Sequence, residues 1–436
     1  MCVCYYMLLH IVAKDSITWG MKHNVQNTDR VSARNGRRVI RAIVWVLVGI
    51  VALVLVAFLW LRTSPAWAGI TLFSERYRVE NFRNIDAIFP HSQTVAAGEQ
   101  VWEFDQDLRP LPIDYDYEGQ ERSVAEFLDR TVTTGLLVVQ GGTIVHEEYR
   151  LGADRRSPFT SWSIAKSVLS ALIGIAIDEG HIDSVHDPIG RYVPAVIGSG
   201  YEHVTIEDAL TMSSGVGFDE DYLNPTSDIN MLFIRTLAMD MPIEQIIADL
   251  ESVREPGVYN EYVSSDSMAL GLVLEHATGV SAGEYLETRL WGPMGAEADA
   301  SWNSDGAGRA FGLCCLNATL RDYARFGRLY LEEGSRDGVP IVPAQWVRES
   351  VNPTAPHLQP GDNPASFWTF GYGYQWWIPE QPQGDFLAIG IWGQYIYVDP
   401  VRQILVVKTS ADPLFDERDA ESVAVFRAIA RAVARQ

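Results

Sequence analysis

Ser163 and Lys166 are the two residues of this sequence best placed to do chemistry. They lie three positions apart at the front of an apolar run, 168–177, which ends at Asp178-Glu179-Gly180. Such a run closed by glycine predicts a buried helix, on which residues three apart share one face. Ser163 would lie in the first turn, where free backbone N–H groups favour a developing negative charge. A hydroxyl, an amine and such a backbone are what nucleophilic acyl transfer requires.

The S-x-x-K spacing also arises by chance, so the lysine content of the chain matters. The chain has four lysines: Lys14, Lys22, Lys166 and Lys408. A lysine that heads an apolar helix is costly to bury unless it has a partner or a function. The rest of the chain must decide between a catalytic pair and a coincidence.

The charge of the chain is strongly negative and unevenly distributed. The net charge is −22, and residues 1–69 hold eight basic and two acidic residues. The remainder therefore carries 26 basic and 54 acidic residues. The strong negative charge of residues 70–436 argues against nucleic acid or anionic membrane surfaces as partners. It is compatible with an exported, soluble domain.

The cysteines and histidines suggest no metal. Cys2, Cys4, Cys314 and Cys315 form no C-x-x-C pair, and the nine histidines have no companions at metal spacing. Cys314 and Cys315 are adjacent, a spacing that disfavours a bond between them, so we expect no disulfide framework. The sequence contains no phosphate loop or dinucleotide fingerprint, and we expect neither metal nor cofactor.

The N-terminal part reads as a membrane anchor. A basic tail, 1–41, precedes an apolar run, 42–61, that has Trp45 and Trp60 near its ends. This length and pattern predict a single transmembrane helix, and the positive flank predicts a cytoplasmic N-terminus with the remaining chain exported. The alternative is a signal peptide cleaved after 66–68. We expect a single-pass protein of the cell membrane whose catalytic domain is extracytoplasmic.

The remaining chain predicts an α+β fold. After a linker and extended arm, 62–120, we expect one domain, 121–436, with a mainly helical subdomain at about 181–365. A β-hairpin is expected over 135–149, and a helix over 420–434 ends the chain. Further strands are expected over 370–378, 386–391, 395–398 and 403–409. Strands from both chain ends imply one antiparallel sheet flanked by helices.

Two further stretches could complete a site. Tyr262 follows a Pro-Gly break and precedes a helix, and a phenol packed beside an amine can exchange a proton with it. The stretch 388–395 places Gly390 and Gly393 in a strand, where a free N–H could help to hold an oxyanion. Either stretch could equally be structural, and the aromatic residues 367–377 could line a cleft or fill the core.

Taken together, these motifs resemble the serine β-lactamase and penicillin-binding superfamily. Within it the chain is most similar to the 6-aminohexanoate-dimer hydrolase branch, which is related to class C β-lactamases. The segments that carry the resemblance are 134–138, 161–167, 210–215, 219–222, 312–328, 371–377 and 393–394.

The resemblance implies a role for each residue. Ser163 would attack the carbonyl, while Lys166 and Tyr262 would handle its proton. The backbone N–H groups of Ser163 and Ile391 would form the oxyanion hole. The residues expected to contact substrate are Tyr222, Asn317 and Trp392.

The sequence also departs from penicillin-processing relatives. Where they carry Lys-Thr-Gly beside the nucleophile, this chain has Ala388-Ile389-Gly390, and Lys408-Thr409-Ser410 comes two strands too late. Ser264 stands where class C enzymes have Asn. We therefore expect a serine hydrolase that acts on a small amide or ester through an acyl-enzyme. The alternatives are a β-lactamase or D,D-peptidase, and a non-catalytic binding protein with the same fold.

Overall fold

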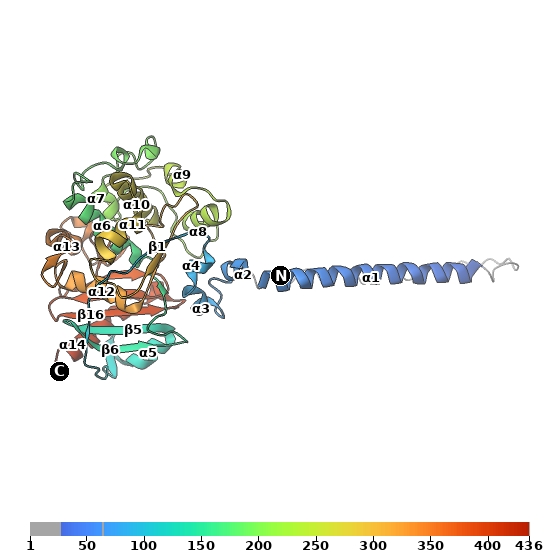
Figure 1. Cartoon of the computed structure of the whole chain (residues 1–436), viewed down its shortest axis with the longest axis horizontal. Helices are drawn as coiled ribbons and strands as arrows, with labels where there is room; N and C mark the ends of the chain where they lie inside the picture. The colour runs from blue at the N-terminus through green and yellow to red at the C-terminus, as the bar shows by residue number, and fades with distance from the viewer. Residues whose placement is uncertain (1–27, 63–64, 436) are drawn as a thin grey trace. The chain divides into compact units, whose positions relative to one another are not determined.

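The computed structural model describes residues 28–62 and 65–435, and the chain divides into two compact units between Ser64 and Pro65 (Figure 1). The first unit contains helix α1 (Thr28–Arg62). Within α1, the 23 residues Ile40–Arg62 are long and apolar enough to cross a membrane, and the predicted span, 42–61, lies inside them. Most of the predicted basic tail lies outside the described residues.

The second unit is built around a sheet of eight strands, in the order β12-β13-β14-β15-β16-β5-β6-β2. Strands from the two chain ends meet where β16 pairs antiparallel with β5 (Figure 1), and the pairing of β2 with β6 is parallel. The predicted α+β sheet built from both chain ends is thereby confirmed. The strands are β2 (Asp105–Gln106), β5 (Thr133–Gln140), β6 (Thr143–Tyr149), β12 (Gly371–Tyr372), β13 (Trp377–Ile378), β14 (Phe386–Gly390), β15 (Gln394–Asp399) and β16 (Ile404–Ser410).

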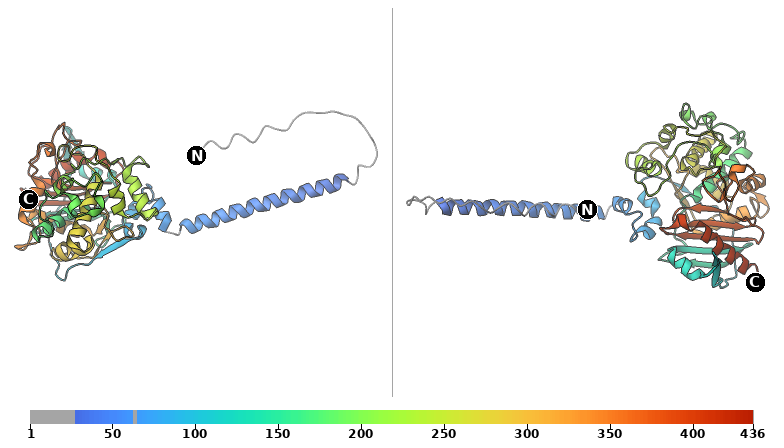
Figure 2. Two further views of the ribbon diagram at one scale, coloured as in Figure 1. Left: turned by 90° about the horizontal axis from the view of Figure 1, so that it is seen from above. Right: turned by 180° about the vertical axis from the view of Figure 1, so that it is seen from behind.

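Alternation along the central strands divides the apolar side chains between two cores. In β5, Leu137 and Val139 belong to the larger core, whereas Leu136 and Val138 belong to the smaller one. Successive side chains of a strand point to opposite faces, so this sheet is buried on both sides. The larger core contains residues of α6 (Ile164–Asp178) and α12 (Leu320–Leu331), and the smaller core contains residues of α5 (Val124–Arg130) and α14 (Asp419–Val433). Figure 2 shows the same sheet from two further directions.

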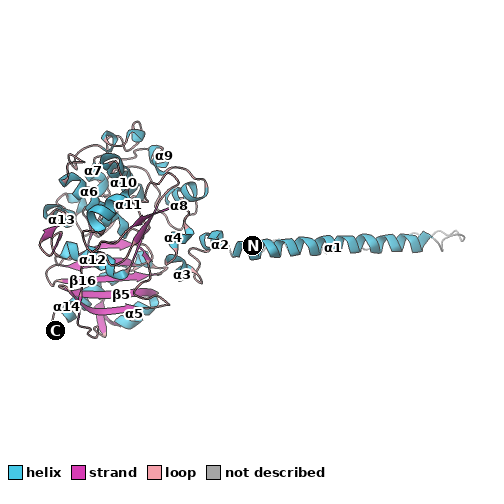
Figure 3. Ribbon diagram, viewed as in Figure 1, coloured by secondary structure: helices cyan, strands magenta, loops and turns pink. Residues whose placement is uncertain are grey.

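Between the two groups of strands, the chain forms mainly helices and three strands that join the earlier strand β1 in a small sheet of order β1-β8-β9-β7 (Figure 3). A capping box begins α7, because Thr205 and Asp208 exchange hydrogen bonds there. The helices are α7 (Ile206–Leu210), α8 (Asp228–Phe233), α9 (Ile243–Ala248), α10 (Ser264–Thr278), α11 (Ala282–Leu286) and α13 (Ala344–Val351). The small sheet contains β1 (Ser92–Val95), β7 (Phe159–Thr160), β8 (Ala300–Asn303) and β9 (Leu316–Ala318).

Residues 65–120 contain more regular secondary structure than the linker and extended arm that the sequence suggested for 62–120. From Pro65 onward it belongs to the second unit. Its strand β1 pairs with β8, and β2 adds to the large sheet, so these segments are held by backbone hydrogen bonds. The remaining elements are the short helices α2 (Pro65–Ile70), α3 (Arg78–Phe82) and α4 (Ile85–Ile88), and the hairpin of β3 (Asp114–Tyr117) with β4 (Gln120–Ser123).

The single strand expected over 370–378 is instead a tight hairpin of β12 and β13. The chain reverses at Gln375, whose φ is +62°, and the Gly373 N–H donates to the Trp376 carbonyl. A side chain at Gly373 would collide with the Ser350 carbonyl, at 1.9 Å. The run of aromatic residues therefore suggested a strand in a place where the backbone has to turn.

The expectation that Cys314 and Cys315 would stay unpaired is wrong. The structure joins them in a disulfide between neighbouring residues, in the segment that precedes β9. Their Cα atoms are 3.8 Å apart, which is shorter than the usual separation in a disulfide. Cys315 has a φ of +67°, and this local turn brings the two side chains together. Spacing along the sequence could not reveal that turn.

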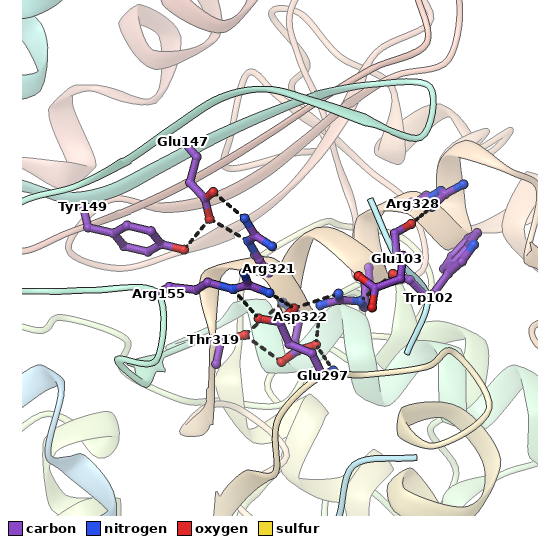
Figure 4. Close-up of polar contacts among 11 residues, drawn as sticks. Trp102, Glu103, Glu147, Tyr149, Arg155, Glu297, Thr319, Arg321, Asp322 and Arg328 are labelled. Carbon is purple, nitrogen blue, oxygen red and sulfur yellow. Dashed lines mark hydrogen bonds and ion pairs between the residues drawn. The ribbon is translucent and has the colours of Figure 1, made fainter. Parts of the chain in front are cut away.

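A buried ion-pair network ties α12 to the surrounding elements (Figure 4). Arg321 makes two hydrogen bonds to Glu147 of β6, at 2.7 and 2.6 Å. Arg325, which is fully buried, contacts the carboxylates of Asp322 and Glu297, each at 2.9 Å, and donates to the Trp102 carbonyl. Buried charges persist only when they are paired and hydrogen-bonded in this way.

Removing the Arg325 side chain should destabilise the protein strongly. We expect Arg325→Ala to lower the free energy of unfolding by about 3–5 kcal/mol, because Asp322 and Glu297 lose their buried partner. Urea unfolding followed by tryptophan fluorescence measures the change. Arg348→Ala, which removes an exposed arginine paired with exposed Glu333, is the matched control and should have little effect. A loss below about 1 kcal/mol for Arg325→Ala would contradict this assignment.

Candidate active site

Ser163 is presented at the start of helix α6 by a strained turn. The preceding residue, Trp162, has a φ of +42°, a conformation that a bulky side chain rarely adopts. Ser161 holds this turn against β9, because its N–H donates to the Leu316 carbonyl and its hydroxyl accepts from the Leu316 N–H. Strain of this kind concentrates at functional sites, where the surrounding structure enforces it.

Lys166 lies one turn further along α6, and its side chain is 1% exposed. Its Nζ is 2.9 Å from Ser163 Oγ, 3.0 Å from the Leu313 carbonyl oxygen and 3.2 Å from Ser264 Oγ. Burial lowers the pKa of the Lys166 amine to about 7, although the negative charges of Glu220 and Asp266 act in the opposite direction. Much of the amine is therefore neutral near pH 7.

Tyr262 lies beside this pair, in the loop that precedes α10. Lys166 Nζ is 4.8 Å from the centre of its ring, and Trp377 stacks on the ring at 5.5 Å. Burial raises the pKa of the Tyr262 phenol, and the charge of Glu220 raises it further, while a hydrogen bond with Ser163 acts in the opposite direction. The phenol therefore keeps its proton, and the amine of Lys166 is the stronger candidate for the base.

Glu220 is a site residue that sequence reasoning missed. Its Oε1 accepts hydrogen bonds from the hydroxyls of Ser264 and Tyr222, each at 2.5 Å, and its Oε2 accepts from the Ser264 N–H at 2.9 Å. The carboxylate thus caps the N-terminus of α10, where negative charge is favoured. Of the residues in this cluster, the resemblance had pointed only to Tyr222.

These contacts fix the orientation of the Lys166 amine. The Ser264 hydroxyl donates its hydrogen bond to Glu220, so its oxygen can only accept from Lys166. The Leu313 carbonyl likewise can only accept. A neutral amine has two N–H groups, and both are used by these two acceptors. Its lone pair is therefore left for the hydroxyl proton of Ser163.

The end of strand β14 lies against the start of α6. A side chain at Gly390 would meet the Ser161 carbonyl at 2.5 Å and the Ser163 nitrogen at 3.1 Å, so only glycine allows this approach. In the described residues, neither the Ser163 N–H nor the Ile391 N–H takes part in a turn, loop or cap hydrogen bond to another backbone group. The Ser163 nitrogen thus lies beside this close approach, and Ile391 directly follows Gly390 in the chain.

The turn after β14 carries Trp392 and is stabilised by hydrogen bonds from neighbouring residues. Gln394 donates to the Ile391 carbonyl, and the Asp412 N–H donates to the Trp392 carbonyl. Lys408 lies on β16, which β15 separates from β14, and its amine contacts Ser410 and the Gly393 carbonyl. Lys408 therefore stabilises the turn through the Gly393 carbonyl. It does not lie on β14, the strand that corresponds to Lys-Thr-Gly in penicillin-processing relatives.

Asn317 uses its side-chain amide within the small sheet, and its role toward a substrate stays a prediction. It lies on β9, and its amide donates to Asn303, Ser301 and the Cys315 carbonyl. No hydrogen bond joins it to Ser163, Lys166 or Tyr262 in the part of the chain that the structure describes. The same described residues contain no group of three or more His, Cys, Asp or Glu side chains that could hold a metal ion.

The fold and this site define a serine hydrolase of the β-lactamase and transpeptidase-like class. The chain belongs to the beta-lactamase family, whose family model matches residues 121–428. It is 30% identical over 298 residues to the 6-aminohexanoate-dimer hydrolase of Paenarthrobacter ureafaciens, an alignment that covers 67% of this chain and 76% of that protein.

Solved structures agree on the fold. A Bacillus anthracis protein, provisionally assigned as a 6-aminohexanoate-dimer hydrolase, matches with a TM-score of 0.76 at 24% identity, covering 84% of this chain and 96% of its own. The octameric penicillin-binding protein homologue from Pyrococcus abyssi matches with a TM-score of 0.55 at 20% identity, covering 71% and 76%. The expected resemblance and fold class are confirmed.

Replacing Glu220 should alter the pH dependence of the reaction. In the wild type we expect kcat/KM for a short ester to rise with pH through a value near 7, as Lys166 loses its proton. In Glu220→Gln the rise of kcat/KM with pH should occur at lower pH, because the negative charge that raises the pKa of Lys166 is gone. The plateau should fall about tenfold, since Ser264 loses its fixed orientation.

The matched control is Glu333→Gln, the same substitution at an exposed glutamate that pairs with Arg348. Its pH profile should match that of the wild type. If kcat/KM of Glu220→Gln rises at the same pH as in the wild type, or at higher pH, the proposed arrangement is contradicted.

Proposed function

We propose that Ser163 is the nucleophile of an acyl-transfer reaction that hydrolyses a small amide or ester. The observation that carries this proposal is the 2.9 Å contact between Ser163 Oγ and the buried amine of Lys166, whose pKa lies near 7. The neutral amine accepts the hydroxyl proton as Oγ attacks the carbonyl carbon. The N–H groups of Ser163 and Ile391 then hold the oxyanion.

Tyr262 passes the proton on to the leaving group. Its phenol lies beside both Ser163 and Lys166 and keeps its proton because its pKa is raised. The proton taken by Lys166 can move through Tyr262 to the departing oxygen or nitrogen, and the amine then activates the water that releases the acyl group. Tyr222, which Glu220 orients, is placed to contact the leaving group.

The substrate class follows from what the site lacks and from the relative. The place that carries a lysine in penicillin-processing enzymes is Ala388-Ile389-Gly390 on β14, which offers no cation for a substrate carboxylate. The Paenarthrobacter relative is named for the dimer of 6-aminohexanoate, an amide. We therefore place linear amides and simple esters ahead of penicillins, with Trp392 as part of the substrate-binding surface.

Helix α1 supports a membrane-anchored form of the enzyme. The apolar stretch Ile40–Arg62 exceeds the length needed to span a bilayer, and the basic residues that precede it favour a cytoplasmic N-terminus. The catalytic unit would then lie on the extracytoplasmic side. A signal sequence would deliver the catalytic unit to the same side without the anchor.

Hydrolysis assays on the full chain test the proposed activity. We expect the wild type to cleave the 6-aminohexanoate dimer or short aryl esters, and Ser163→Ala to cleave neither. If penicillin acylates Ser163 and the other two substrates are not cleaved, the β-lactamase or peptidase alternative is favoured instead. Absence of Ser163-dependent turnover with all three substrates would favour the non-catalytic alternative.

The leaving group separates the role of Tyr262 from that of Lys166. Tyr262→Phe should slow hydrolysis of an amide at least a hundredfold, because an amine must be protonated as it leaves. It should slow hydrolysis of a nitrophenyl ester much less, because nitrophenolate leaves without a proton. Phe preserves the stacking on Trp377, so folding should be unchanged. Equal losses with both substrates would contradict this role.

A further inference from the structure

An unbroken series of aromatic contacts links the segment after α1 to the rim of the active site. Phe73 stacks on Trp392 with ring centres 5.5 Å apart and an angle of 9°. Trp392 contacts Phe415 at 5.8 Å, and Phe415 contacts Tyr222 at 6.2 Å. Trp392 follows the oxyanion residue Ile391, and Tyr222 shares the Glu220 carboxylate with Ser264. This series of rings therefore borders the catalytic centre.

Helix α3 fixes this segment in place. Phe82 packs edge-on against Trp162 at 5.2 Å and contacts Trp392 at 5.5 Å, while Arg78 lies over the Trp392 ring at 5.5 Å. Trp162 immediately precedes the nucleophile. The segment after α1 is thus docked on the two turns that present Ser163 and the oxyanion N–H of Ile391.

Several large apolar side chains in this series, or close to it in the sequence, are exposed. Leu223 is 91% exposed, Ile70 69%, Phe73 48% and Leu414 43%. Leu223 adjoins Tyr222, and Leu414 adjoins Phe415. We call Ile70, Phe73, Leu223 and Leu414 the apolar rim. Exposed apolar residues gathered beside a site indicate a partner that is itself apolar.

Chain length identifies that partner. Phe73 comes eleven residues after Arg62, where the candidate membrane span ends, and an extended chain of that length covers at most about 40 Å. Six of the intervening residues are helical, in α2, which shortens the reach further. The net negative charge of the body disfavours attraction to anionic headgroups, so the contact we consider is apolar.

We infer that the apolar rim rests on the bilayer that holds α1, and that the active site takes acyl esters or amides with a long aliphatic chain from that bilayer. This inference rests on the proposed function and anchor. The bond that forms joins Ser163 Oγ to the acyl carbon, and the bond that breaks releases the alcohol or amine with the serine proton. Water then releases the fatty acid and restores the Ser163 hydroxyl.

The test uses the full chain reconstituted in phosphatidylcholine vesicles. One substrate is umbelliferyl palmitate, which partitions into the bilayer, and the other is water-soluble umbelliferyl acetate. The variant Leu223→Asp/Leu414→Asp places two charges on the apolar rim at exposed positions. Val401→Asp is the matched control, because Val401 is 72% exposed in the turn between β15 and β16, at the end of β15 opposite the oxyanion turn.

We expect the rim variant to hydrolyse the palmitate at least tenfold more slowly than the wild type, with acetate hydrolysis within twofold. Val401→Asp should match the wild type on both substrates. Equal effects of the rim variant on the two esters, unchanged palmitate hydrolysis, or a wild type that cleaves acetate only would overturn the inference. A wild-type protein that hydrolyses neither ester would instead contradict the proposed function, and the inference with it.

Discussion

The site depends on burying the Lys166 amine against the Ser163 hydroxyl. In water, an amine with a pKa near 10.5 is charged at pH 7 and cannot accept a proton. Helix α6 is apolar along most of its length and packs in the larger core, so the amine at its first turn loses its hydration. The fold thus favours the neutral form of one amine by withholding solvent from it, as the proposed base requires.

Burial alone would leave the amine free to point in several directions. Glu220 removes that freedom through Ser264, since a carboxylate that accepts the hydrogen bond of the hydroxyl leaves an oxygen that only accepts. The carboxylate is near enough to moderate the shift in the pKa of Lys166 yet does not contact the amine directly. Gly390 lets the end of strand β14 lie against the start of α6, close to the Ser163 nitrogen. Glu220 therefore contributes to both the positioning of the amine and its electrostatics, while β14 packs against the start of α6.

Local patterns in the sequence predicted what local physics determines. The helix that begins at the S-x-x-K motif was predicted from its apolar run and the glycine that ends it. The strands at both chain ends were predicted from short apolar runs bounded by turn residues. Glu220 could not be found in this way, because it meets Ser264 across 44 positions of sequence through a loop without periodicity. The turn at Gln375 and the bond between Cys314 and Cys315 depend on backbone torsions that residue types alone do not reveal. Asn317 came from resemblance, and its contacts in this chain are those of the small sheet.

The most direct test of the central claim is the intact mass of the full chain after treatment with a fluorophosphonate, which labels only activated serines. The account predicts one adduct on the wild type and none on Ser163→Ala, with a labelling rate that rises with pH through a value near 7. No adduct on folded wild-type protein, or an equal adduct on Ser163→Ala, would show that Ser163 is not the activated nucleophile.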